Sequence, residues 1–161
     1  MSITEEILIR IGQVQQMANQ LVLIVGPRGS GKTLALRAVA EQAGYPYLGV
    51  GLALSEDLLD VPPTERPFRV SPALDKLVDK HGPVVLLDNL EILFEPTLQL
   101  NPLSLLQTLS RSRTVVAAWN GALTGSTLTH AEPGHREYRT YPRGQLVVVA
   151  LGIVSGAEDN R

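Results

Sequence analysis

The amino-acid sequence predicts an α/β domain, a three-layer αβα sandwich whose five-stranded sheet is mainly parallel. Short apolar runs recur along the chain, and stretches with helical periodicity alternate with them. Strands that alternate with helices pair in parallel and leave helices on both faces of the sheet. The length of 161 residues fits one domain with a sizeable core. We therefore expect one domain over residues 1–161, with an N-terminal helix within 1–19, the core over 20–152 and a flexible tail over 153–161.

Composition restricts the class of protein. Apolar residues make up 44% of the chain and charged residues 19%, which is typical of a globular rather than a disordered protein. A net charge of −2 argues against a chain built mainly to grip nucleic acid. The absence of cysteine excludes disulfides, cysteine-based zinc sites and thiol catalysis. The N-terminus lacks a signal-peptide pattern and the apolar runs are too short to span a bilayer, so we expect a cytoplasmic protein with no membrane partner.

The first predicted element is a helix over residues 3–19, because apolar residues recur from Ile3 to Met17 at spacings of three and four. Ser2 and Glu5 fit a capping box at its start. We expect this helix to pack on its own domain. A helix that binds a partner is the alternative.

Five short runs rich in branched apolar residues are predicted as strands. They span residues 20–26, 46–54, 83–89, 114–120 and 145–151. Helices are predicted over residues 32–43, 55–60, 71–80 and 102–111. Ser71 is expected to cap the third of these helices, with Pro72 at its first position. Residues 61–70 hold three prolines and residues 121–144 are polar and rich in Gly, Thr and His, so both segments are predicted as loops.

The segment "GPRGSGKT" follows the first predicted strand and opens a predicted helix. Its Gly26, Gly31, Lys32 and Thr33 fit the P-loop pattern G-x-x-x-x-G-K-[ST]. The glycines let backbone N–H groups approach phosphate oxygens, and the helix aims its positive end at the same anion. Lys32 would neutralise the β- and γ-phosphates, and Thr33 would join a magnesium shell. The sequence therefore predicts a P-loop NTPase fold that takes ATP and Mg²⁺.

The residues predicted to bind the nucleotide are Gly26, Pro27, Arg28, Gly29, Ser30, Gly31, Lys32, Thr33 and Leu34. The alternative for this stretch is a plain strand-to-helix turn with an exposed lysine. ATP is favoured over GTP because the chain lacks a clear N-K-x-D motif for reading guanine.

The run "VVLLDNLE" supplies the acid that a P-loop protein needs for magnesium. Asp88 follows four apolar residues, as in the Walker B pattern, and would hold a metal-bound water beside the metal ligand Thr33. Capping of the following helix is the alternative role for Asp88. Many P-loop ATPases carry a catalytic glutamate immediately after this aspartate, but Asn89 stands there in this chain. Glu91 is the nearest carboxylate, which either activates water or lies in the first turn of a helix.

The run "TVVAAWNG" carries a polar residue at the end of the fourth predicted strand. In AAA+ proteins a polar residue, often asparagine, ends the strand between the P-loop strand and the Walker B strand. This sensor 1 residue contacts the γ-phosphate or the attacking water. Asn120 fits that catalytic place, and a turn asparagine before glycine is the alternative. Trp119 is expected in the core or an interface rather than as a platform for the base.

Five arginines are candidates for an arginine finger, for contacts to a phosphate backbone or for solvated loop positions. They are Arg111, Arg113, Arg136, Arg139 and Arg143. His130 and His135 flank Glu132, but no third ligand is obvious, so a metal site is not expected there.

The segments "GPRGSGKT", "VVLLDNLEILF", "VVAAWNG" and "AEPGHREYR", followed by "LVVVAL", resemble the small P-loop proteins of type 3 BREX phage-defence systems, called BrxF. The resemblance spans residues 5–152. It implies an accessory ATPase-like component that acts with other BREX proteins to block phage DNA. Those partners would include a large ATPase, an adenine methyltransferase, a phosphatase-like protein and a helicase. Contact with DNA would be direct or through these partners, and a homo-oligomer is a further expectation.

The chain also resembles the core of AAA+ proteins, which usually carry a helical lid after their fifth strand. Residues 152–161 follow that strand here, so we expect a core that lacks the lid. The predicted function is a nucleotide-dependent switch or weak, partner-dependent ATPase. One alternative is an assembly module that does not hydrolyse ATP, favoured by Asn89. The other is a small-molecule or nucleotide kinase, which usually needs an acidic residue after its second strand.

Overall fold

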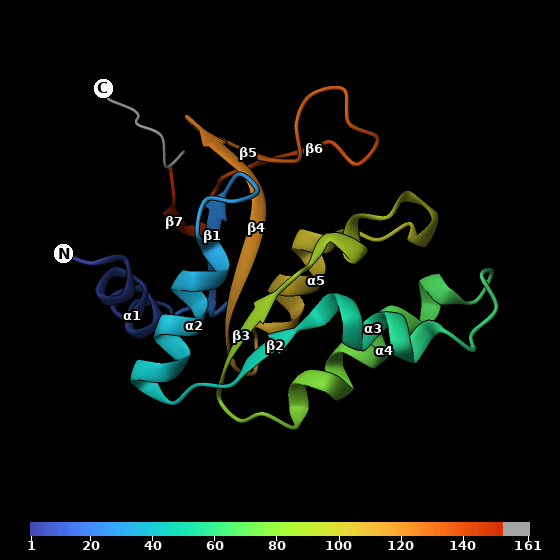
Figure 1. The fold of residues 1–161 in the computed structure, drawn as a ribbon, viewed down its shortest axis with the longest axis horizontal. Helices are drawn as coiled ribbons and strands as arrows, with labels where there is room; N and C mark the ends of the chain where they lie inside the picture. The colour runs from blue at the N-terminus through green and yellow to red at the C-terminus, as the bar shows by residue number, and fades with distance from the viewer. Residues whose placement is uncertain (153–161) are drawn as a thin grey trace.

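The computed structural model describes residues 1–152 and shows a sheet between two layers of helices (Figure 1). The predicted tail, 153–161, lies outside the described residues. The helices are α1 (Ile3–Val14), α2 (Lys32–Ala43), α3 (Val50–Leu58), α4 (Arg66–Asp79), α5 (Pro102–Leu109) and the short 3₁₀-helices η1 (Glu91–Phe94) and η2 (Pro96–Leu98). The strands are β1 (Leu21–Gly26), β2 (Tyr47–Gly49), β3 (Val84–Asp88), β4 (Thr114–Thr124), β5 (Thr127–His130), β6 (Arg139–Pro142) and β7 (Val147–Ala150).

Five of the strands form a parallel sheet in the order β2-β3-β4-β1-β7, which confirms the predicted fold class. β4 therefore lies between β1 and β3. In this register Gly26 of β1 lies beside Asn120, and Gly49 of β2 lies beside Asp88. Because the strands are parallel, the P-loop, Asp88 and Asn120 all meet at the C-terminal edge of the sheet.

Alternate residues of the central strands face opposite layers of helices. On one face, apolar side chains such as Ile24 and Leu86 pack against α1 and α2. On the other face, Leu23 and Leu87 pack against α3, α4 and α5. Asp88 follows Leu86 at the next alternate position, so its side chain leaves the sheet on the side of α2, which begins at the P-loop.

The helix α1 confirms the predicted capping box, but it ends at Val14 rather than at residue 19. The backbone N–H of Glu5 donates to Ser2 Oγ at 3.1 Å, and the N–H of Ser2 donates to Glu5 Oε1 at 2.9 Å. Ile7 and Ile11 are buried against the sheet, as expected for a helix that packs on its own domain. The helix is shorter because the chain must turn before it enters β1.

The strand predicted over residues 46–54 is wrong beyond Gly49, where the chain turns into α3. The apolar content of this segment is compatible with either a strand or a helix, and only the spacing of its apolar residues distinguishes the two. Val50, Leu54 and Leu58 recur at a spacing of four and are buried together in the core, which favours a helix. The helix predicted over residues 55–60 is the second half of this longer one.

The loop predicted over residues 61–70 is also partly wrong, because α4 begins at Arg66. Pro67 lies in the first turn, where its missing N–H costs little, and Pro72 lies inside the helix rather than at its start. Val70 and Leu74 are buried in the same core cluster as residues of α3 and of the sheet. Tertiary burial of these side chains therefore overrides the local preference of proline.

Residues 121–144 are not the polar loop that their composition predicts. The end of β4 pairs with β5, and β5 pairs with β6, both antiparallel. We call residues 121–142 the flap. A Cβ on Gly121 would lie 1.8 Å from the carbonyl oxygen of Thr129, so glycine alone fits this close approach of β4 to β5. Leu128 and His130 of β5 are buried while Thr127 and Thr129 are less so, which is the alternation of a strand.

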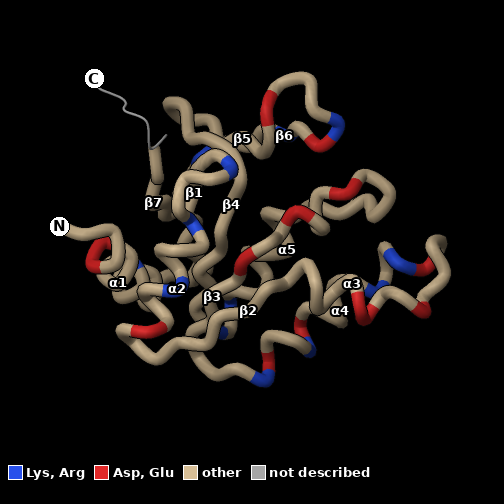
Figure 2. The backbone as a smooth tube through the Cα atoms, viewed as in Figure 1, with Lys and Arg blue, Asp and Glu red and all other residues tan. Residues whose placement is uncertain are grey.

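Five further predictions are confirmed, because each of these elements begins and ends within two residues of its predicted bounds: β1, α2, β3, α5 and β7. Acidic and basic residues are interspersed along the helices and loops rather than gathered on one face (Figure 2). Among residues 1–152, no helix is long and apolar enough to cross a membrane.

Candidate functional site

The P-loop connects β1 to α2 through glycine conformations that other residues rarely adopt. Gly29 and Gly31 have φ values of +81° and +98°. Gly26 is restricted differently, because a Cβ there would lie 2.4 Å from Ser30 Oγ and 2.9 Å from the carbonyl oxygen of Leu151. The backbone can therefore fold tightly over the N-terminus of α2, where N–H groups and the helix dipole favour an anion.

Lys32 is buried inside this loop, with 7% of its surface exposed. Its Nζ donates to the carbonyl oxygens of Gly26 and Pro27, at 2.9 and 2.7 Å, and lies 3.4 Å from Ser30 Oγ. Burial lowers the pKa of Lys32, while the negative charges of Glu91 and Asp88 act in the opposite direction. The alternative of an exposed lysine on a plain turn is therefore wrong, because the ammonium group is held at the centre of the loop.

Asp88 accepts hydrogen bonds from three directions. Its Oδ2 accepts from Thr33 Oγ1 at 2.6 Å and from the Tyr47 hydroxyl at 2.5 Å, and its Oδ1 accepts from the N–H of Asn89 at 2.9 Å. Only 4% of Asp88 is exposed. Burial and the bond to Asp88 raise the pKa of Tyr47. Thr33 and Asp88, the two predicted metal residues, are thus brought together, and the Asp88 side chain does not cap a helix.

Thr33 and Asp88 match what Mg²⁺ requires in a P-loop protein. Mg²⁺ in such sites is held by one or two protein oxygens together with phosphates and water. Within residues 1–152 there is no cluster of three His, Cys, Asp or Glu side chains that could hold a metal ion without a nucleotide. A hydroxyl and a carboxylate, the side chains of Thr33 and Asp88, fit a Mg²⁺ ion that is also held by phosphates and water.

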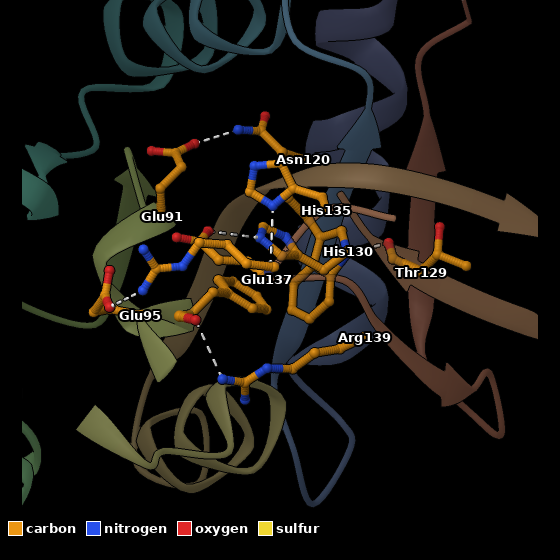
Figure 3. A network of polar contacts seen from close by, with 11 residues as sticks. Glu91, Glu95, Asn120, Thr129, His130, His135, Glu137 and Arg139 are labelled. Atoms are coloured by element: carbon orange, nitrogen blue, oxygen red, sulfur yellow. Dashed lines mark hydrogen bonds and ion pairs between the residues drawn. The ribbon is translucent and has the colours of Figure 1, made fainter. Parts of the chain in front are cut away.

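Glu91 and Asn120, the two predicted catalytic residues, are also brought together. Glu91 begins η1, three residues after the end of β3, and Asn120 follows the last buried residue of β4, Trp119. The Asn120 amide donates to Glu91 Oε2 (Figure 3). Asn89, which stands at the usual place of the base, adopts a left-handed φ of 59° and packs near Gly49 and Gly51. The structure therefore places a carboxylate and an amide side by side at the edge of the sheet.

A pocket of about 920 Å³ lies between the P-loop, the flap and the end of β7. It is lined by Pro27 and Arg28 of the P-loop, by Glu91 and Asn120, and by Leu151. Its lining does not include Lys32, Thr33 or Asp88. The predicted catalytic pair, Glu91 and Asn120, thus faces the pocket, while the predicted metal residues lie outside its lining, Thr33 at the start of α2 and Asp88 at the end of β3.

The remaining predicted nucleotide residues differ in exposure. Pro27, Arg28 and Gly29 are exposed at the tip of the loop, whereas Ser30 is buried. Leu34 is 75% exposed in the first turn of α2.

The flap packs against the rest of the domain through an aromatic cluster of His130, Phe94 and Trp119. His130 stacks on Phe94 with ring centroids 3.4 Å apart, and Trp119 packs edge-on against both. Trp119 is 1% exposed and its indole N–H donates to the Thr129 carbonyl oxygen at 2.8 Å, so its prediction as a core residue is confirmed. Burial lowers the pKa of His130 to about 4, so this histidine is neutral. Its Nε2 lies 3.7 Å from Glu137 Oε1.

Two candidate arginines of the flap contact the segment after Glu91, and Figure 3 labels one of them, Arg139. Arg139 donates to the carbonyl oxygens of Leu100 and Phe94, at 2.6 and 3.2 Å. Arg136 pairs with Glu95 at 2.7 Å on the surface. Arg139 therefore serves the fold of this molecule. The other four stay candidates for intermolecular contacts or for solvated positions: Arg111, Arg143, Arg136 and Arg113, which pairs with Asp79.

Sequence reasoning missed Tyr47 and His130 as neighbours of the site. Tyr47 opens a strand of three residues that pairs with β3, and no recognisable motif surrounds it in the sequence. Its only local signal is a polar aromatic residue at the start of a strand. The sequence around His130 shows only a second histidine and a glutamate nearby, whereas its neighbours in the fold are the aromatic rings of Phe94 and Trp119.

Residues 22–114 match the sequence model of a family described as ATPase family associated with various cellular activities (AAA). Curated protein sequences gave no match. Among solved structures, PCH-2 from C. elegans covers 93% of this chain and 42% of its own, with 16% identity and a TM-score of 0.49. A katanin structure, described in terms of its self-assembly, covers 74% of this chain and 43% of its own, with 20% identity and a TM-score of 0.42. This chain thus spans less than half the length of either protein.

Proposed function

Since this chain belongs to the ATPase family associated with various cellular activities (AAA), we propose that it binds ATP with Mg²⁺ and hydrolyses it weakly or with the help of a partner. The observation that carries the proposal is the hydrogen bond of 2.6 Å between Thr33 and Asp88. It joins the first turn of the P-loop helix to the end of β3, which is where a Mg²⁺–ATP complex needs its two protein oxygens.

The proposed binding mode follows from the loop. Backbone N–H groups of residues 28–33 would surround the β-phosphate, since Gly26 has no Cβ to block the turn. Phosphate oxygens would replace the carbonyl oxygens that now accept from Lys32. Thr33 would hold Mg²⁺ directly and Asp88 would hold it through water. The ion, when bound, would neutralise charge on the phosphates during cleavage.

The hydrolytic part of the proposal rests on Glu91 and Asn120. The amide of Asn120 would turn to the γ-phosphate, and Glu91 would then be released to orient the attacking water. The hydrogen bond between the two side chains supports this pairing. It also supports slow turnover, because the carboxylate must leave its present partner before it can accept from water.

We further propose that the chain is a nucleotide-dependent component of a bacterial BREX phage-defence complex in the cytoplasm. The resemblance of "VVLLDNLEILF" and "AEPGHREYR" to BrxF proteins supports this role. Other BREX proteins would be its partners, a homo-oligomer is part of the proposal, and contact with DNA would be direct or through those partners. Lys32→Ala is expected to abolish phage protection in cells. Normal protection by a stably expressed variant would contradict the role.

A second function is an assembly module that binds ATP without hydrolysing it. Asn89 at the usual place of the base favours this function, since its amide cannot accept a proton from water. The two functions differ in one measurement: the module would show tight nucleotide binding and no phosphate release with any partner.

The first experiment measures ATP binding by calorimetry and phosphate release by the purified protein, with and without duplex DNA. Lys32→Ala should weaken ATP binding about 100-fold, equivalent to about 3 kcal/mol, because a buried charge-assisted contact is lost. Lys80→Ala is the matched control, since Lys80 is exposed at the end of α4. Glu91→Gln should keep binding and lose phosphate release. A wild-type protein that binds no ATP would contradict both functions.

A further inference from the structure

We propose that Tyr47 is a positioning residue that fixes the orientation of the Asp88 carboxylate for the magnesium shell. The inference rests on the proposed function and adds a residue from β2 to the site. It comes from one contact, the hydrogen bond of 2.5 Å from the Tyr47 hydroxyl to Asp88 Oδ2.

The acceptor capacity of Asp88 shows what this bond does. Each oxygen of a carboxylate accepts about two hydrogen bonds. Oδ2 accepts from both Thr33 and Tyr47, whereas Oδ1 accepts from the Asn89 N–H. One acceptor position is therefore left, on Oδ1, and it would take a proton of a metal-bound water. Without the Tyr47 hydroxyl, Oδ2 would have a free position and the carboxylate could turn.

The Tyr47 ring is itself held in place. Tyr47 pairs in register with Leu86, two residues before Asp88 on the same face of β3, so its side chain lies on the side of α2. The guanidinium of Arg37, on α2, lies over the ring at 4.4 Å from its centroid. Contacts from β3 and α2 thus restrict the direction in which the hydroxyl donates.

Thr33 links this arrangement to the metal. Because its hydroxyl proton is donated to Asp88, the lone pairs of Oγ1 remain for a cation. A carboxylate that turned would accept this proton in a different direction and would move those lone pairs. Tyr47 thus acts on the metal ligand through Asp88 and touches neither the nucleotide nor the cation.

The variant Tyr47→Phe separates this role from packing, because it keeps the ring and its contact with Arg37 and removes the hydroxyl. Tyr45→Phe is the matched control, since Tyr45 packs against the same apolar cluster as Tyr47 and makes no hydrogen bond to Asp88 in the described chain. Asp88→Asn removes the charge and serves as the variant with the full loss.

The experiment measures Mn²⁺ binding by the electron paramagnetic resonance signal of free Mn²⁺, with the protein saturated by a non-hydrolysable ATP analogue. Tyr47→Phe should raise the Mn²⁺ dissociation constant about threefold to tenfold, as expected for one lost hydrogen bond. The affinity for the analogue in the presence of a chelator should stay unchanged. Tyr45→Phe should match the wild type.

Two outcomes would overturn the inference and they are distinguishable. Mn²⁺ binding that is unchanged or tighter in Tyr47→Phe, but lost in Asp88→Asn, would remove the role of Tyr47 and leave the proposed function in place. A wild-type protein whose Mn²⁺ binding does not depend on the analogue would contradict the proposed function and this inference together.

Discussion

Asp88 and Glu91 lie close together in the sequence and at the same edge of the sheet, yet they are held in different ways. Asp88 is buried and accepts from three donors that belong to α2, β2 and the adjacent backbone. Glu91 is partly exposed and bonds to a single amide, that of Asn120, at the root of the flap. The proposed metal side of the site is therefore held by several elements, whereas the proposed hydrolytic side depends on how the flap is attached.

Three side chains of the flap contact residues 94–100, the segment that follows Glu91. His130 stacks on Phe94, Arg139 donates to the carbonyl oxygens of Phe94 and Leu100, and Arg136 pairs with Glu95. These contacts differ in burial, so they should differ in energy. Changing them one at a time tests whether the hydrolytic side can be disturbed while the metal side stays intact.

The largest effect is expected from Gly121→Ala at the root of the flap. The added Cβ would meet the Thr129 carbonyl oxygen at 1.8 Å, so β4 and β5 must separate. We expect a loss of about 3 kcal/mol in the free energy of unfolding, the upper end for overpacking. Denaturant unfolding followed by the fluorescence of Trp119, the single tryptophan, measures it.

Gly12→Ala is the control for this prediction, because a Cβ at Gly12 of α1 meets nothing within 4 Å. ATP binding by Gly121→Ala should be affected less than phosphate release. Equal losses of binding and release would show that the two sides of the site are not separable.

The second effect is the pH dependence of stability through His130. Burial, with Arg139 and His135 nearby, outweighs the bond to the Asn120 backbone and lowers the pKa of His130 to about 4. The unfolded chain binds this proton near pH 6.5 and the folded chain does not, so acid favours unfolding between pH 6.5 and 4. The free energy of unfolding should fall by about 2 kcal/mol from pH 7 to pH 5.

Unfolding curves of His130→Gln measured across the same range test this prediction. The variant should lose most of the slope, and His135→Gln, on the exposed flap loop, should keep it. Glu137, 3.7 Å from His130, is the carboxylate that would oppose the effect by stabilising the charged ring. The same slope in His130→Gln and in the wild type would assign the pH dependence to other groups.

The smallest effect is expected from the arginines. Arg139→Gln removes a charged donor from two backbone carbonyl oxygens and should lower the free energy of unfolding by about 1 kcal/mol. Arg136→Gln should cost less than about 0.5 kcal/mol, because its ion pair with Glu95 is exposed to solvent. Thermal unfolding of both variants shows which substitution destabilises the protein more. A larger loss of stability for Arg136→Gln would contradict the view that Arg139 is the arginine that holds the flap in place.

The sequence predicts the metal side of the site better than the hydrolytic side, for physical reasons. The P-loop and its helix are specified by residues next to one another, so β1 and α2 are found where they were expected. The flap depends on pairing between segments that composition describes as polar loop. Leu128 is buried in the larger core cluster, and His130 packs on Phe94, from a distant segment, and on Trp119 of β4.

The helix α4 shows the same limit from the opposite direction. Its prolines disfavour a helix locally, and for that reason they predict a loop. Val70, Leu74 and Val78 nevertheless fill one face of the core, and their burial decides the outcome. Tyr47 could not be assigned to the site from sequence, because its contact with Asp88 exists only after β2 and β3 pair.

The contacts of Lys32 give the P-loop a form of selectivity. Any anion that reaches the ammonium group competes with Gly26 O, Pro27 O and Ser30 Oγ, which already serve as its acceptors. The affinity for an anion therefore depends on how much stronger its bonds to Lys32 are than the bonds that Lys32 gives up. An anion that offers a single oxygen gains little from the exchange. A polyphosphate, which offers several charged oxygens to Lys32 and to the α2 N-terminus at once, gains from each of them.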